Sequence, residues 1–110
     1  AVLIDDRWLY VADAVILTND GRPLLPSVHS RPISLHIAAI GWLEGQCSRA
    51  FIPGHGAIIG DRARRAADLA NRRRYLEAIA PGGPISFESA TRGCVPPFLG
   101  REWHEENCRT

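Results

Sequence analysis

The chain has no methionine and no lysine, so all thirteen of its basic residues are arginine. No apolar run approaches the roughly 20 residues of a membrane-spanning helix. No basic stretch followed by an apolar one indicates a signal peptide. Thirteen basic and twelve acidic residues leave a formal net charge of +1, which gives no overall field to attract a nucleic acid or an acidic surface. The sequence therefore predicts a protein without a membrane or nucleic-acid partner.

Cysteine is scarce and follows no ligand pattern. Cys47, Cys94 and Cys108 lie far apart, and no Cys-x-x-Cys pair occurs. This spacing argues against a zinc–cysteine knot and leaves room for at most one disulfide. The three cysteines therefore specify neither a compartment nor a role.

At 110 residues the chain is long enough for one domain with a core. Its 45% hydrophobic and 23% charged content is that of a soluble globular protein. It opens on Ala1-Val2-Leu3-Ile4, which is typical of the inside of a strand, and closes on residues 104–110, which resemble the start of a helix. With no initiator methionine, we expect residues 1–110 to be a single partial domain, truncated at both ends.

Apolar runs and turn residues predict a strand–loop–helix–strand order. The expected elements are a hairpin of strands at 2–5 and 8–13, a loop over 14–31, a helix over 35–44, a strand ending at 51–52, a helix over 62–80, a short helix from 87 to 90 and a last helix opening near 104. Ser34 and Asp61 are the expected caps of the two long helices. This order is that of an α/β layered fold.

The two long helices carry different patterns. Apolar residues lie on both sides of the 35–44 helix, so we expect it to be covered over most of its circumference. The predicted docking stripe of the 62–80 helix consists of Ala66, Leu69, Leu76 and Ala80. Six arginines point all around this helix and favour a solvated surface over a nucleic-acid-binding face: Arg62, Arg64, Arg65, Arg72, Arg73 and Arg74.

One short motif presents a histidine on a turn. Phe51-Ile52 is typical of the end of a buried strand, and Pro53-Gly54-His55-Gly56 then stops it. Gly54 and Gly56 lack Cβ, so the backbone can adopt positive φ and approach a bound group closely. The motif holds the His55 imidazole at the mouth of a sheet, where it can bind a metal or move a proton. An ordinary Pro-Gly turn with a solvated histidine is the alternative.

An acidic residue ends the apolar strand that precedes this motif in the chain. Asp13 follows Trp8-Leu9-Tyr10-Val11-Ala12 directly. A carboxylate at the end of a buried strand needs a hydrogen-bond partner or a metal. Asp13 is therefore a candidate metal ligand, and the alternative is an acceptor for the loop that follows.

In this order the two motifs resemble the second half of the metallo-β-lactamase-fold metallohydrolases. In that family a strand ends in a Gly-Asp pair whose aspartate bridges two metals, and a Pro-Gly-His-Gly turn gives a histidine to the second metal. Asp13 and His55 are the counterparts here, although Ala12 stands in place of the glycine. The resemblance implies the C-terminal half of a four-layer αββα sandwich. It also implies two zinc ions in the intact protein and attack by metal-bound hydroxide on an ester, thioester or amide of a small-molecule substrate.

The end of the chain resembles one branch of the family, the quinoprotein relay system zinc metallohydrolases and related sulfur-oxidation proteins. Those carry a histidine and an asparagine three residues apart in the last helix, as His104 and Asn107 are here. This resemblance implies a site-shaping role for His104, beside Gly54 and Gly56, and a periplasmic or secreted protein. Packing of the first helical turn is the alternative for His104.

The family takes most of its zinc ligands from a His-x-His-x-Asp-His motif in its first half. No His-x-His pair occurs among His29, His36, His55 and His104. Asp13 and His55 are two ligands, whereas a catalytic zinc needs about three from the protein. We therefore expect weak or absent metal binding by this chain alone, with the missing N-terminal half of the same fold as its partner. The alternative is a non-catalytic family remnant or scaffold without a complete metal site.

Overall fold

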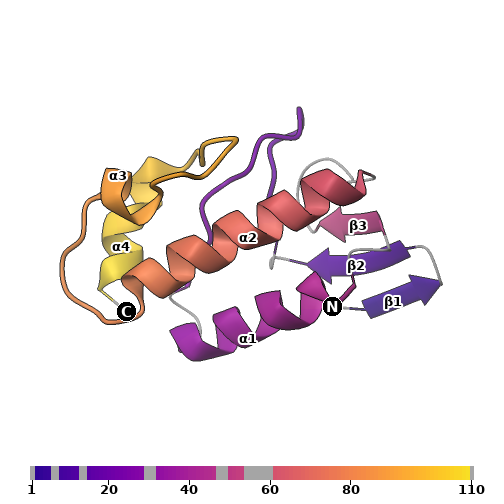
Figure 1. Cartoon of the computed structure of the whole chain (residues 1–110), viewed down its shortest axis with the longest axis horizontal. Coiled ribbons are helices and arrows are strands. Elements are labelled where there is room, and N and C mark those ends of the chain that lie inside the picture. Colours follow the sequence, from indigo (N-terminus) through magenta and orange to yellow (C-terminus); the bar gives the residue numbers. More distant parts are fainter. Residues whose placement is uncertain are drawn as a thin grey trace.

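A helix through the middle of the molecule, α2 (Arg62–Ile79), lies beside elements from both ends of the chain (Figure 1). The structure is a computed structural model and describes residues 2–5, 8–12, 15–28, 32–46, 50–53 and 61–109. At a rise of about 1.5 Å per residue, the 18 residues of α2 span about 27 Å. That length lets one helix contact the sheet near its start and the C-terminal helices near its end.

The elements occur in the order that the sequence predicts. They are β1 (Val2–Asp5), β2 (Trp8–Ala12), α1 (Ile33–Glu44), β3 (Ala50–Pro53), α2 (Arg62–Ile79), α3 (Phe87–Ala90), the 3-10 turn η1 (Arg101–Trp103) and α4 (His104–Cys108). The mixed α and β composition is confirmed, and the described part of the chain is richer in helix than in strand. The four-layer sandwich stays a prediction.

The described strands form one sheet in the order β1-β2-β3. β1 and β2 pair antiparallel as the expected hairpin. β2 and β3 pair parallel, and α1 lies between them in the chain (Figure 1). A parallel pair requires such a crossover connection. The predicted strand–loop–helix–strand unit is therefore confirmed.

Helix α1 packs by a narrower stripe than the sequence predicts. Its buried residues are Ile40 and Leu43, while Leu35 and Trp42 are 54% and 52% exposed. The prediction that this helix is covered over most of its circumference is therefore wrong. The predicted Ser34 cap is also wrong, because the helix begins at Ile33 after Pro32 and has no side-chain cap. In a helix that is apolar on several sides, only its neighbours decide which side is buried.

Helix α2 begins as predicted, with the Asp61 carboxylate accepting a hydrogen bond from the Ala63 N–H at 3.0 Å. Its buried face differs from the predicted one. Leu69 and Leu76 are buried as expected, but Ala66 and Ala80 are exposed. The rest of the face consists of Arg65, Asp68, Asn71, Arg72, Tyr75 and Ile79.

Two arginines of α2 lie in the interior, which corrects the prediction of a solvated arginine surface. Arg72 is fully buried and Arg65 is 4% exposed. The Arg72 guanidinium pairs with Asp68 and donates to two backbone carbonyls, so its burial does not leave its charge uncompensated. Arg62, Arg64 and Arg74 are exposed as expected. Burial removes Arg65 and Arg72 from any nucleic-acid-binding surface.

Residues 15–28 have the irregular backbone that the sequence predicts, but they are part of the core. The side chains of Val15, Leu25 and Val28 are fully buried, and that of Leu17 is 3% exposed. The tip of the segment is a tight turn in which Gly21 has φ of +84° and its N–H donates to the Thr18 carbonyl. This segment therefore contributes buried side chains to the core, as the helices do.

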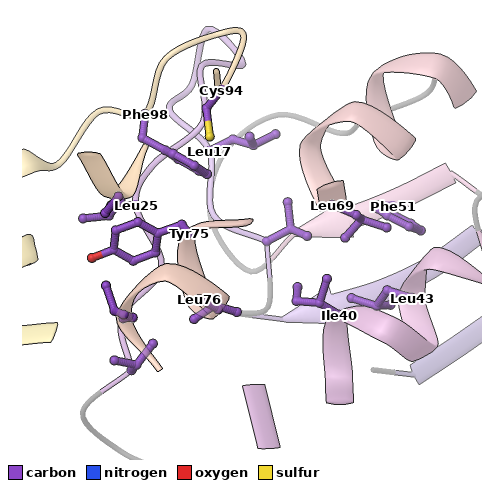
Figure 2. Close-up of a cluster of buried hydrophobic side chains, with 14 residues drawn as sticks. Leu17, Leu25, Ile40, Leu43, Phe51, Leu69, Tyr75, Leu76, Cys94 and Phe98 are labelled. Carbon is purple, nitrogen blue, oxygen red and sulfur yellow. The ribbon is translucent and has the colours of Figure 1, made fainter. Parts of the chain in front are cut away.

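The core extends along α2 (Figure 2). Near the sheet it contains Phe51, Leu69, Ile40 and Leu43, and farther along α2 it contains Tyr75, Leu76, Leu25 and Phe98. Residues from β3, both long helices, the 15–28 segment and the C-terminal segment thus share one continuous cluster.

Replacing Arg72 by alanine leaves the Asp68 carboxylate buried without its cation. We expect this change to lower the free energy of unfolding by about 3–5 kcal/mol. The double variant Asp68→Leu/Arg72→Met, which removes both charges and keeps apolar volume, should recover most of the loss. Urea unfolding measures both, with the exposed Arg74→Ala as control, expected within about 0.5 kcal/mol of the parent. A loss below about 1 kcal/mol for Arg72→Ala would contradict the dependence of the buried Asp68 carboxylate on this cation.

Candidate functional site

Strands β2 and β3 end together. Their parallel pairing sets Tyr10 opposite Ile52 and Ala12 opposite Pro53, with an irregularity in the register between the two pairs. The carboxyl ends of neighbouring parallel strands meet at one edge of a sheet, which is where open α/β sheets place their sites. Asp13 follows Ala12 directly, and Gly54-His55-Gly56 follows Pro53 directly.

The predicted ligands themselves lie outside the described residues. This holds for Asp13 and His55 and also for the two glycines that flank the histidine, Gly54 and Gly56. Convergence of the Asp13 carboxylate and the His55 imidazole on one metal therefore stays a prediction. The described part of the site is its scaffold: the two strand ends, and the segment that follows Asp13.

The segment after Asp13 is held by the buried guanidinium of Arg72. Nη2 of Arg72 donates to the Ile16 carbonyl at 2.9 Å, and Nη1 donates to the Leu24 carbonyl at 2.9 Å. The Asp68 carboxylate orients the guanidinium, with Nε–Oδ2 at 2.7 Å and Nη2–Oδ1 at 3.3 Å. The ring of Phe98 lies against its other surface, 5.5 Å from centroid to Cζ. One side chain of α2 therefore fixes both limbs of the 15–25 segment.

His104 takes part in a buried hydrogen-bond network with Tyr75. Its Nε2 lies 2.6 Å from the Ile85 carbonyl oxygen, and its Nδ1 lies 2.8 Å from the Tyr75 hydroxyl. A carbonyl only accepts, so Nε2 carries the hydrogen, and in the neutral ring Nδ1 accepts from the tyrosine hydroxyl. Both ring nitrogens of His104 therefore have hydrogen-bond partners inside the protein, as the alternative role in helix packing predicts.

Asn107 completes this network and ties it to the 15–28 segment. Its Nδ2 donates to the Tyr75 hydroxyl at 3.1 Å and to the Pro26 carbonyl at 2.7 Å. Its Oδ1 accepts from the Val28 N–H at 3.2 Å. The histidine and asparagine three residues apart therefore meet through Tyr75. A place for His104 beside the metal site stays a prediction.

The network around Tyr75 and the sheet contact α2 at different positions along the helix axis. The guanidinium of Arg65 lies over the ring of Phe51 in β3, at 5.7 Å. Tyr75 is ten residues farther along, which corresponds to about 15 Å of helix. Figure 1 likewise shows α4 near the C-terminal end of α2 and the sheet near its N-terminal end.

The described cysteines are free thiols. Cys94 is buried, and burial raises the pKa of its thiol. Cys108 lies 3.5 Å from Nε2 of His104, at a shallow hollow lined by Pro84, Ile85, Ser86, His104 and Glu105. Because the imidazole hydrogen bonds leave no free lone pair, His104 cannot accept the thiol proton. This arrangement is therefore not a nucleophile–base pair.

The described ranges hold no group of three or more histidine, cysteine, aspartate or glutamate side chains that form a metal site. None of the helices that the structure describes has the length and apolar character needed to cross a membrane. Comparison with protein-family models, with curated proteins and with solved structures finds no match to this chain.

Sequence reasoning missed the polar residues that organise the interior, namely Asp68, Arg72 and Tyr75. Asp68 and Arg72 are four residues apart, which is the spacing of a helical ion pair and a usable signal. Their burial has no such signal, because their carbonyl partners are 48 and 56 residues away in the chain.

The pKa of Tyr75 is raised to about 12, chiefly because burial penalises the phenolate. The unfolded chain loses this proton near pH 10, so the unfolded state binds fewer protons between pH 10 and 12. The stabilising contribution is therefore complete below pH 10 and is lost as the pH rises towards 12. Over this range we expect the parent to lose about 2–3 kcal/mol that Tyr75→Phe does not lose. Urea unfolding of both proteins at several pH values measures the difference, and parallel curves would contradict the role of Tyr75.

Proposed function

We propose that this chain is the C-terminal portion of a zinc-dependent hydrolase with the four-layer metallo-β-lactamase-type sandwich. Asp13 and His55 are its zinc ligands, and the N-terminal half of the same fold supplies the remaining ones. One observation supports this most directly. The parallel pairing of Ala12 with Pro53 brings the chain to the same sheet edge immediately before Asp13 and immediately before Gly54-His55.

The donor chemistry fits zinc in part. A carboxylate and an imidazole are two of the ligand types that zinc takes in catalytic sites. Two ligands fall short of the usual three, and the described residues offer no further cluster to complete the set. The chain therefore fits as one part of a zinc site, with the other ligands provided by the N-terminal half.

Each residue of this chain has a defined task in the proposal. The Asp13 carboxylate would hold zinc as an electrostatic anchor, and it would not act as the general base. The His55 imidazole would be a further zinc ligand, and glycines at 54 and 56 would allow the backbone to approach a bound group closely. Zinc, when bound, supplies the Lewis acidity that activates water against an ester, thioester or amide of a small-molecule substrate.

The test uses the full-length protein that contains this chain and its N-terminal half. Asp13→Ala and His55→Ala should both lower zinc content at the second position, and the aspartate change should be the more damaging because it removes a bridging ligand. Turnover of activated ester and thioester substrates should fall with zinc content. His36→Ala is the matched control, since it removes a histidine from α1 and should keep both zinc ions.

The outcomes distinguish a zinc hydrolase from a non-catalytic family remnant. If either ligand variant keeps full zinc and full turnover, that residue is not a ligand and the proposal fails. A parent protein that folds but holds no zinc is a non-catalytic family remnant. A His-x-His-x-Asp-His motif in the preceding half is expected for the enzyme, and its absence would favour the remnant.

A further inference from the structure

Helix α1 carries an apolar stripe on the side opposite its buried residues, Ile40 and Leu43. The members of this outer stripe recur at the i, i+3, i+4 and i+7 positions of one helical face and are Leu35, Ala38, Ala39 and Trp42. Leu35 and Trp42 are 54% and 52% exposed, and both alanines are exposed as well. Figure 1 shows α1 along one edge of the molecule, with α2 on its inner side.

A solvated helix face in the same protein has a different composition. The exposed side of α2 carries charged residues, among them Arg62, Arg74 and Glu77. Helix α1, which the structure describes throughout, contains a single acidic residue and no arginine, and that residue, Glu44, pairs with Arg73 of α2. Charged residues are depleted from the core of protein–protein interfaces. The outer stripe therefore has the composition of a contact surface rather than that of a solvated one.

The residue sizes in the outer stripe are symmetric about its middle. Large side chains stand at its ends, Leu35 and Trp42, and two alanines lie between them. When two copies of α1 pair antiparallel about a two-fold axis between positions 38 and 39, Leu35 of each copy lies against Trp42 of the other. Ala38 then lies against Ala39, so the helix axes can approach to about 8 Å, the short end of the usual range. A two-fold interface requires such a self-complementary surface.

Charge also favours a second copy as the occupant. Any charge close to a two-fold axis meets the same charge of the partner, and the outer stripe carries none. The antiparallel direction sets the positive end of each helix dipole beside the negative end of the other. The nearby pair of Glu44 and Arg73 carries no net charge, so it does not oppose the approach of an identical surface.

We propose that the outer stripe of α1 binds a second copy of this chain as an antiparallel, two-fold symmetric helix pair. The contact is small, because the 12 residues of α1 span about 18 Å and one stripe covers less than the roughly 800 Å² per partner of a stable interface. The dimer is therefore concentration-dependent, with a dissociation constant in the micromolar range. This pairing does not depend on the proposed function, since no residue of the stripe is a proposed zinc ligand.

Sedimentation velocity of the full-length protein that contains this chain, over a series of micromolar concentrations, measures the dimer. Ala38→Glu places like charges at the two-fold axis and should weaken dimerisation by about 100-fold or more. Leu35→Gln removes an apolar contact at both ends of the pair and should weaken it about tenfold. This second variant keeps the test decisive if Ala38→Glu fails to fold. Ala70→Glu makes the same change at an exposed position of α2, and it should dimerise like the parent.

A compensating variant tests the antiparallel register. In Ala38→Glu/Ala39→Arg each new carboxylate faces the new guanidinium of the partner, whereas neighbouring positions within one helix do not face each other. We expect its dissociation constant to return to within about tenfold of the parent's. A parallel pair sets each position against its own copy, so it gives no such recovery.

Three results would overturn the proposal. A parent that stays monomeric over the whole series leaves the N-terminal half or a different partner as the occupant of the stripe. Dimerisation that Ala38→Glu and Leu35→Gln leave unchanged takes place through another surface. Loss of the dimer in Ala38→Glu without recovery in the compensating variant excludes the antiparallel pair. Zinc content should be the same in all these variants, so the proposed function is tested separately.

Discussion

Every N–H of a buried guanidinium needs an acceptor, and this requirement at Arg72 shapes much of the structure. Asp68 supplies one set of acceptors from the same helix, and the carbonyls of Ile16 and Leu24 supply the others from a segment that has no regular structure. An unpaired buried charge is strongly destabilising. In the folded protein Arg72 therefore joins α2 to the segment that contains Ile16 and Leu24. The same segment also contributes four buried apolar side chains to the core: Val15, Leu17, Leu25 and Val28.

A second buried polar centre, farther along α2, also binds backbone groups of irregular segments. Tyr75 connects His104 and Asn107, and these in turn reach the backbone at Ile85, Pro26 and Val28. Each partner is satisfied, so the network specifies one arrangement of the C-terminal segment rather than merely tolerating it. The result is a helix with two buried polar centres, each of which fastens irregular backbone to a regular element.

This construction suits a site carried on loops. Binding residues are commonly placed on loops that a rigid scaffold positions. Here the sheet fixes the chain up to Ala12 and Pro53, and the arginine of α2 fixes it again from Ile16 onward.

The sequence by itself determined the elements and their order, because those depend on local patterns: the hairpin, the Asp61 cap and the strand–loop–helix–strand unit. It also put two candidate ligands directly after two strands. Tertiary structure alone decided which faces are buried. Helix α1 is apolar on several sides, so packing against α2 chose Ile40 and Leu43 and left Leu35 and Trp42 exposed. Arg72 is charged and reads as a surface residue, yet it is buried because its acceptors lie 48 and 56 residues away in the chain. Long-range pairing of polar groups has no local signature, and for that reason the fold, not the pattern, determined the interior of this protein.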